Sequence, residues 1–235
     1  MTSSDPPATK FADLGLASRA LADQLAASLK MALDARGAAS LVVSGGKTPT
    51  NLFELLREEK LDWRRVCIAL ADERWVDPGN EASNEKLVRD VLLKGPAAAA
   101  RFHGLKNAAP TPDIGAVSAW ETFARVPRPF DAVVLGMGDD GHTASLFPGS
   151  PNIKSALDST SVAGCVGMRA PVAPQPRLSL NLSALLDTRR VVLLIAGAAK
   201  WRTYLKASAP GPELEMPVRA ILRQTRAPVE VVWSP

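Results

Sequence analysis

The chain has 235 residues, of which 46% are hydrophobic and 22% are charged. This length and balance allow a large buried core and exclude a disordered chain or a coiled coil. No apolar run reaches the roughly 18 residues of a membrane span, and the polar N-terminus has no secretory signal pattern. Two cysteines cannot build a disulfide framework, so a reducing cytoplasm is the expected compartment.

The net charge of +4 raises the question of nucleic-acid binding. Residues 1–125 carry 16 basic and 16 acidic side chains, so the whole excess lies in residues 126–235, where the basic side chains are scattered. Nucleic-acid-binding proteins usually concentrate basic residues in a stripe or cluster. We therefore expect neither a nucleic acid nor a membrane as partner, but a small anionic ligand.

Hydrophobic periodicity and turn residues predict alternating helices and strands along the chain. Asp13 can cap the first helix and Gly37 can end it; Thr48 can cap the second, with Pro49 as its first residue, and Ser83 can cap the third. The predicted elements are a helix over 14–36, a strand over 40–43, a helix from 49, a strand over 66–71 with a loop over 72–75, a helix after 83, a helix over 113–125, strands over 132–135, 178–182 and 190–196, helices through 201–205 and from 217, and a strand over 229–233.

This alternation predicts an α/β fold with a parallel sheet covered on both faces. We expect a flexible N-terminal segment over 1–10 and a single domain over 11–235. The proline-rich stretch 171–176 reads as an ordered surface loop, and residues 207–215 as loop-like. Ligands of such sheets bind at the carboxyl ends of the strands, and three loops are expected there.

The first loop is Ser44-Gly45-Gly46-Lys47-Thr48-Pro49, between a strand and a helix. Glycines let backbone N–H groups approach an anion, and the helix N-terminus adds partial positive charge. Lys47 or the Thr48 hydroxyl could add a contact. A tight turn with a capping threonine explains the same residues equally well, and the pattern of a P-loop is absent.

The second loop is Asp72-Glu73-Arg74. Acidic and basic side chains together can orient a polyhydroxyl ligand, and the planar guanidinium of Arg74 can bind an oxyanion. Taken alone, the segment fits a solvated, salt-bridged loop better.

The third loop, residues 136–148, contains a literal Gly-x-Gly-x-x-Gly pattern. A dinucleotide site is rejected because Asp139 and Asp140 would place two carboxylates beside a pyrophosphate. His142 is more informative, because an imidazole among glycines at a strand end can act as a general base that a carboxylate orients. Ser145 lies in no nucleophile elbow, and His103 is interpreted as structural.

The histidines and cysteines follow no zinc-binding spacing, so no metal site is expected. Together the loops resemble the signature blocks of the 6-phosphogluconolactonase family. The blocks are Ser44-Gly45-Gly46-Lys47-Thr48-Pro49, Asp72-Glu73-Arg74-Trp75-Val76, Ser83-Asn84, Gly136-Met137-Gly138-Asp139-Asp140-Gly141-His142-Thr143-Ala144-Ser145-Leu146-Phe147-Pro148, Arg177-Leu178-Ser179-Leu180 and Gly197-Ala198-Ala199-Lys200. One departure is Lys47, where many members of the family have serine or threonine.

The resemblance implies a three-layer α/β/α fold with a modified Rossmann-like, mostly parallel sheet. It implies a hydrolase without metal or cofactor that opens a sugar-phosphate lactone, 6-phospho-D-glucono-1,5-lactone, in the oxidative pentose phosphate pathway, as a monomer or weak homodimer. His142 would activate water, Asp140 would orient His142, and Arg74 would stabilise the oxyanion or hold the phosphate. The substrate-binding residues implied are Gly45, Gly46, Lys47, Thr48, Asp72, Gly141, Arg177 and Lys200.

Three other functions compete with this interpretation. A glucosamine-6-phosphate deaminase would use a similar scaffold, but the block around His142 does not suit its chemistry. A regulatory sugar-phosphate-binding module would keep the phosphate site and would need no base. A basic nucleic-acid-binding protein would lose its ligand steeply as salt is added.

Overall fold

The computed structural model describes residues 8–171 and 174–235. A seven-stranded sheet forms the centre, in the order β1-β10-β9-β6-β2-β3-β5, and every neighbouring pair is parallel. Its strands are β1 (Ala8–Lys10), β2 (Ala39–Val43), β3 (Val66–Leu70), β5 (Arg101–His103), β6 (Ala132–Leu135), β9 (Val191–Ala196) and β10 (Val229–Ser234). The predicted parallel sheet is therefore confirmed.

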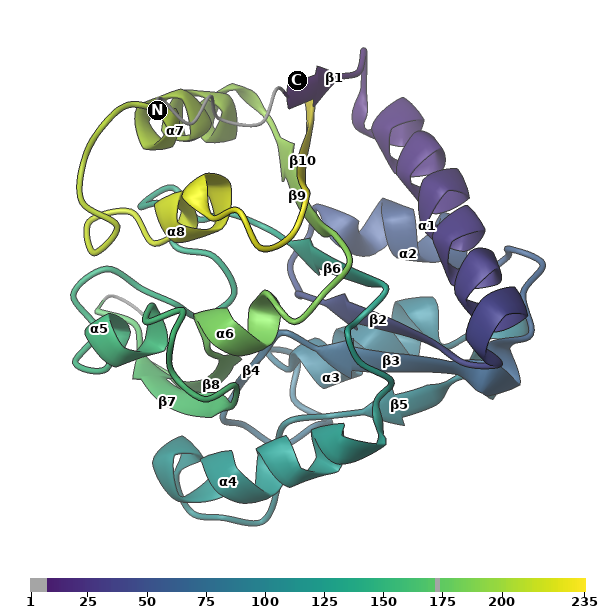
Figure 1. Cartoon of the computed structure of the whole chain (residues 1–235), viewed down its shortest axis with the longest axis horizontal. Helices are drawn as coiled ribbons and strands as arrows, with labels where there is room; N and C mark the ends of the chain where they lie inside the picture. Colours follow the sequence, from purple (N-terminus) through teal and green to yellow (C-terminus); the bar gives the residue numbers. More distant parts are fainter. Residues whose placement is uncertain (1–7, 172–173) are drawn as a thin grey trace.

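Helices lie on both sides of this sheet, which gives the expected three layers (Figure 1). On one side are α1 and α2, and on the other are α6, α7 and α8. The α-helices are α1 (Leu14–Arg36), α2 (Pro49–Leu56), α3 (Asn84–Leu87), α4 (Pro112–Thr122), α5 (Ile153–Ala156), α6 (Leu182–Leu185), α7 (Ala198–Ser208) and α8 (Val218–Arg223). A π-helical turn at Val88–Leu92 extends α3, and 3₁₀ turns lie at Trp63–Arg65, Gly95–Ala99 and Phe123–Arg125.

The ends of α1 are as the sequence predicts. Oδ1 of Asp13 accepts a hydrogen bond of 2.8 Å from the backbone N–H of Leu16, and this satisfies one of the unpaired N–H groups of the first turn. Gly37 ends the helix with φ +73°, a backbone conformation that favours glycine. Between these caps the apolar face of the helix is buried against the sheet and α2.

The predicted loop over 72–75 is wrong for its first three residues. Asp72–Arg74 forms β4, which pairs antiparallel with β8 (Pro176–Leu180), and β8 pairs with β7 (Cys165–Arg169) in a second, three-stranded sheet. The pairing joins segments about a hundred residues apart, so local sequence could not reveal it. It places Arg74 directly opposite Arg177.

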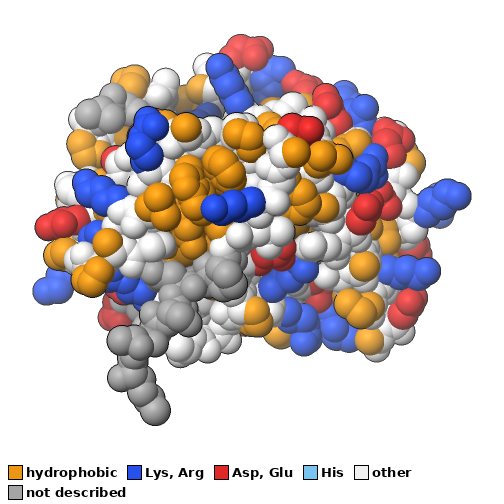
Figure 2. Space-filling view, turned by 90° about the horizontal axis from the view of Figure 1, so that it is seen from above, with side chains coloured by type: hydrophobic (Ala, Val, Ile, Leu, Met, Phe, Trp, Pro, Cys, Tyr) orange, Lys and Arg blue, Asp and Glu red, His pale blue; other side chains and the backbone are white. Residues whose placement is uncertain are grey.

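The predicted flexible segment 1–10 is wrong for its last three residues, which form β1 beside β10. Contacts with aromatic rings at this sheet edge explain why residues 8–10 form a strand. The rings of Trp201 and Trp233 have centroids 4.8 Å apart, and Nζ of Lys10 lies 4.5 Å from the centroid of Trp201. Figure 2, which looks down on this end of the molecule, shows hydrophobic side chains gathered on the face. Residues 1–7 lie outside the described part of the chain.

Two smaller expectations concern loops. Residues 172 and 173 of the predicted proline-rich loop lie outside the described residues, and Pro176 already belongs to β8. The segment 207–215 is loop-like except that α7 continues to Ser208. Within residues 8–171 and 174–235, no helix is long and apolar enough to cross a membrane.

Candidate functional site

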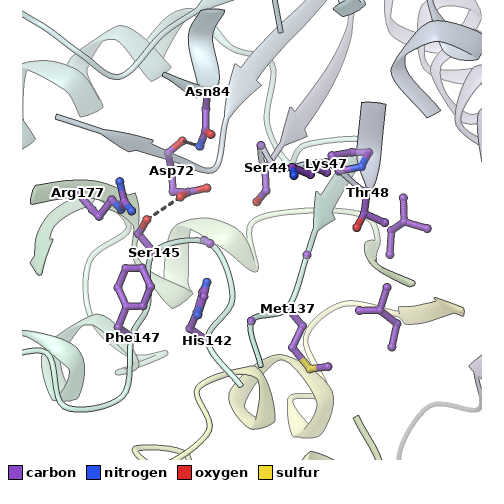
Figure 3. Close-up of a pocket in the computed structure, with 18 of the residues that line it drawn as sticks. Ser44, Lys47, Thr48, Asp72, Asn84, Met137, His142, Ser145, Phe147 and Arg177 are labelled. Carbon is purple, nitrogen blue, oxygen red and sulfur yellow. Dashed lines mark hydrogen bonds between the residues drawn. The ribbon is translucent and has the colours of Figure 1, made fainter. Parts of the chain in front are cut away.

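A pocket of about 410 Å³ lies where the carboxyl ends of β2, β3, β6 and β9 meet (Figure 3). Parallel strands bring the loops that follow them to one edge of the sheet. Ten of the eleven predicted site residues line the pocket: Gly45, Gly46, Lys47, Thr48, Asp72, Arg74, Asp140, His142, Arg177 and Lys200. Gly141 is not among the lining residues; it lies in the same loop with φ +80°, and its Cα faces Met216.

His142 is held by Asp140 and Phe147. Nδ1 of His142 lies 2.6 Å from Oδ1 of Asp140, which also accepts a 3.0 Å hydrogen bond from the backbone N–H of His142. The imidazole packs on the ring of Phe147 with centroids 4.4 Å apart, and about 30% of the His142 side chain is exposed. A proton on Nδ1 bonded to the carboxylate leaves Nε2 with a lone pair, as a general base requires.

The backbone beside His142 must be glycine. A Cβ at Gly138 would lie 2.0 Å from Nδ1 of His142, so any side chain there would displace the ring. Burial opposes the charge of Asp140, but hydrogen bonds from the His142 side chain and backbone prevail and lower the pKa of this carboxyl. The carboxylate is therefore ionised and able to orient the imidazole.

The loop after β2 places the hydroxyl of Thr48 at the pocket. Thr48 stands before α2 but has helical backbone angles and makes no side-chain cap, so the predicted capping role is wrong. The reason is that the turn starts earlier, with the N–H of Thr50 bonded to the carbonyl of Lys47 at 3.3 Å. Pro49 is the first residue of the helix, as predicted. Gly46 has φ +109°, which a residue with a Cβ rarely adopts.

The segment 72–74 is more buried than a solvated loop would be. In a strand, alternate side chains face opposite ways, so Asp72 and Arg74 face the pocket while Glu73 points away from it. The Glu73 carboxylate is fully buried and accepts bonds from the backbone N–H groups of Arg74, Asn84 and Glu85 and from Oγ of Ser83, at 2.6, 2.7, 2.8 and 3.0 Å. Burial raises the pKa of Glu73, although these four hydrogen bonds act to lower it. Glu73 is therefore a structural anchor that fixes the start of α3.

The cationic side chains stand at two different ends of the pocket. Arg177 lies beside Asp72 and Ser145, whereas Lys47 and Thr48 lie across the pocket (Figure 3). Lys200 follows β9, at the opposite end of the four contributing strands from β3, and its Nζ is 2.9 Å from Oδ1 of Asp139.

The Arg177 side chain is buried, and its Nη1 has no hydrogen-bond partner among the described residues. Burial, and then the neighbouring charge of Arg74, lowers the pKa of this guanidinium. The charges of Asp72 and Glu73 act against this lowering. A buried guanidinium with an unpartnered Nη1 at a pocket suits an anionic ligand. Arg74 itself donates through Nη1 to the carbonyl of Ala82, which directs its guanidinium.

Four polar or aromatic residues that line the pocket were not predicted as site residues: Ser44, Asn84, Ser145 and Phe147. Asn84 donates through Nδ2 to the carbonyl of Asp72 at 2.9 Å and fills the space that a Cβ at Gly45 would need. Oγ of Ser145 donates to Oδ2 of Asp72 at 2.6 Å. All four stand in or beside the blocks that carry the resemblance, but sequence position does not show which way a side chain points.

The described residues contain no group of three or more His, Cys, Asp and Glu side chains arranged to hold a metal ion. The fold and the pocket define an α/β protein of Rossmann-like class, with a pocket lined by basic side chains at the carboxyl edge of a parallel sheet. The chain belongs to the family described as glucosamine-6-phosphate isomerases/6-phosphogluconolactonase, whose family model matches residues 13–233.

Two relatives and one solved structure with similar sequences carry the same name. The chain is 47% identical over 216 residues to a 6-phosphogluconolactonase of Rhizobium meliloti (strain 1021), covering 92% of this chain and 93% of the relative. It is 46% identical over 217 residues to a 6-phosphogluconolactonase of Pseudomonas aeruginosa, covering 92% and 90%. The crystal structure of a 6-phosphogluconolactonase from Shewanella baltica OS155 superimposes with a TM-score of 0.95 at 44% identity, covering 98% of each chain.

Proposed function

We propose that this chain is a hydrolase that opens 6-phospho-D-glucono-1,5-lactone to 6-phosphogluconate in the oxidative pentose phosphate pathway. The names of the relatives support the substrate. The single observation that supports the chemistry is the His142–Asp140 pair, which leaves Nε2 of the imidazole free at a cationic pocket. A lactone is an activated ester, so a positioned water and a base are sufficient for its cleavage.

In the proposed mechanism, Nε2 of His142 takes a proton from a water molecule as that water attacks C1 of the lactone. The carbonyl oxygen becomes an oxyanion in the tetrahedral intermediate. The bond between C1 and the ring oxygen then breaks, and the imidazolium returns its proton to that oxygen, which becomes the C5 hydroxyl. The carboxylic acid formed at C1 loses its remaining proton to solvent and becomes the carboxylate of the product. Asp140 stabilises the imidazolium between the two steps. General acid–base catalysis of this kind contributes about 10²–10⁴-fold.

The phosphate is assigned to the end of the pocket formed by Gly45, Gly46, Thr48 and Lys200. Backbone N–H groups, the start of α2 and a lysine together suit a dianion there. We assign Arg177 and Arg74 to the C1 end, because Arg177 lies across the pocket from Thr48 (Figure 3). A guanidinium at C1 would stabilise the oxyanion and the carboxylate of the product.

The test is a coupled assay on freshly generated lactone, corrected for its spontaneous opening. The wild-type chain should accelerate hydrolysis, and His142→Ala should lower kcat by about 10²–10⁴-fold while leaving the fold and the binding of 6-phosphogluconate nearly unchanged. His103→Asn is the matched control, because His103 lies on β5 outside the pocket. Undiminished turnover in His142→Ala would remove this histidine from the mechanism, and an inactive wild type would overturn the function itself.

A further inference from the structure

One buried hydrogen bond in the pocket has no role in the mechanism above. Ser145 is 1% exposed and Asp72 is 6% exposed, and Oγ of Ser145 donates to Oδ2 of Asp72 at 2.6 Å. The Ser145 backbone is fixed as well, because its N–H donates to Oγ of Ser179 at 3.3 Å. Bonds from hydroxyl to carboxylate are short and strong, and this one fixes the plane of the carboxylate.

The backbone before Ser145 is strained. Ala144 has φ +47°, and among the described residues it is the only one other than glycine with a positive φ. Ala144 lies inside a turn in which the N–H of Leu146 bonds to the carbonyl of Thr143 at 2.9 Å, and this turn holds its conformation. Oγ1 of Thr143 also donates to the carbonyl of Gly136 at 2.9 Å. Strained residues persist where the surrounding structure holds them, and they cluster at functional sites. Here the strained residue directly precedes Ser145, whose hydroxyl bonds to Asp72.

The other carboxylate oxygen of Asp72 accepts no hydrogen bond from the described residues. With Oδ2 bonded to Ser145, no described side chain or N–H group donates to Oδ1, and Asp72 lines the pocket. Asp72 lies on the same side as Arg177, across from Thr48 (Figure 3). A carboxylate there cannot favour a phosphate or an oxyanion, but it is a strong acceptor for a sugar hydroxyl.

We propose that Ser145 is a positioning residue that holds Asp72 to accept a hydrogen bond from the C2 hydroxyl of the sugar. This inference rests on the proposed function, because C2 is the hydroxyl-bearing carbon next to the C1 carbonyl that His142 serves. The pair then makes the enzyme specific for lactones with a free hydroxyl beside the carbonyl. A site that hydrogen-bonds a substrate hydroxyl rejects the analogue without it, because its buried polar group is left unpaired.

The experiment compares two substrates in wild type and Ser145→Ala. On 6-phosphogluconolactone the variant should lose about ten- to hundredfold in kcat/KM, since the carboxylate is no longer held in place. On the 2-deoxy analogue, which has no C2 hydroxyl to misplace, wild type and variant should differ by less than about threefold. Ser155→Ala, whose exposed hydroxyl bonds only to the carbonyl of Asn152 in its own turn, is the matched control and should change neither value.

A second arm tests whether Ser145 acts through Asp72. Because Asp72→Ala already removes the carboxylate that Ser145 positions, adding Ser145→Ala to it should cost no further activity. An equal loss on both substrates, or additive losses in the double variant, would overturn the proposal.

Thermal-shift binding of 6-phosphogluconate and its 2-deoxy analogue separates this inference from the proposed function. If wild type is catalytically inactive, Ser145→Ala must still weaken only the binding of the hydroxylated acid; equal weakening of both overturns the inference.

Discussion

The two ends of the pocket are built in different ways. At the β4–β8 end, Asp72 and Arg177 are buried, and Glu73 of β4 accepts four hydrogen bonds, three of them from residues at the start of α3. At the opposite end, Gly46 and Lys47 are exposed, and the Nζ of Lys200 is paired with the exposed carboxylate of Asp139. One end is rigid and desolvated, and the other is open to water.

This difference separates two tasks of a sugar-phosphate enzyme. Charges that act on a developing oxyanion are most effective in a fixed, desolvated position, where no reorganisation is needed during the reaction. A phosphate that does not react needs only attraction and N–H donors, and a partly hydrated loop supplies both. The contrast supports the assignment of C1 to the β4–β8 end and of the phosphate to the end with Gly45 and Lys200.

Among the changes that test this contrast, the largest expected effect is at Arg177. Arg177→Met should lower kcat/KM for the lactone by about 10²–10³-fold, as the loss of one oxyanion-stabilising donor typically does. The free energy of unfolding should stay the same or rise, because the guanidinium is buried with an unpartnered Nη1. Coupled assays and urea unfolding measure the two quantities.

Arg169→Met is the control for Arg177, because Arg169 is an exposed residue of the neighbouring strand β7. It should keep both activity and stability. A clear loss of stability in Arg177→Met would mean that Arg177 contributes to the stability of the fold. The contrast between the two ends would then fail.

The next effect is on stability and tests the rigidity of the β4–β8 end. Glu73→Gln should lower the free energy of unfolding by about 2–4 kcal/mol, because the amide NH₂ cannot accept the bonds that one carboxylate oxygen now accepts. Urea denaturation measures it, with Glu121→Gln on the exposed face of α4 as the control. A change within about 0.5 kcal/mol would show that this end is not rigidly anchored.

Most of the fold could be predicted because the signals for it are local. The cap at Asp13, the stop at Gly37 and the apolar runs of β3 and β6 are readable within a few residues, and the alternation of strands and helices then requires a parallel sheet. The second sheet could not be predicted in this way. β4 has three residues, two of which are acidic, and such a segment is not typical of a strand. It forms a strand because it pairs with β8.

The site divides in the same manner. His142 and the glycines around it are recognisable because their residue types are unusual at the end of a strand, and the structure places Asp140 against the imidazole. Ser145 and Asn84 were not predicted as site residues because serine and asparagine are common in loops. Their importance lies in the hydrogen-bond partner of each side chain. The burial of Arg177 likewise depends on the pairing of β8 with β4, which is a long-range contact.

The smallest expected effect is at the open end of the pocket, and it tests whether the phosphate lies there. Lys200→Ala should raise KM for 6-phosphogluconolactone by about tenfold and leave kcat nearly unchanged, because a partly exposed ammonium that binds a non-reacting group stabilises ground state and transition state alike. For gluconolactone without phosphate, KM should not change. Lys206→Ala, an exposed lysine on the same helix, controls for the overall loss of positive charge. If Lys200→Ala affected both substrates equally, Lys200 would serve the sugar or the carbonyl, and the phosphate would have to be reassigned to the arginines at the β4–β8 end.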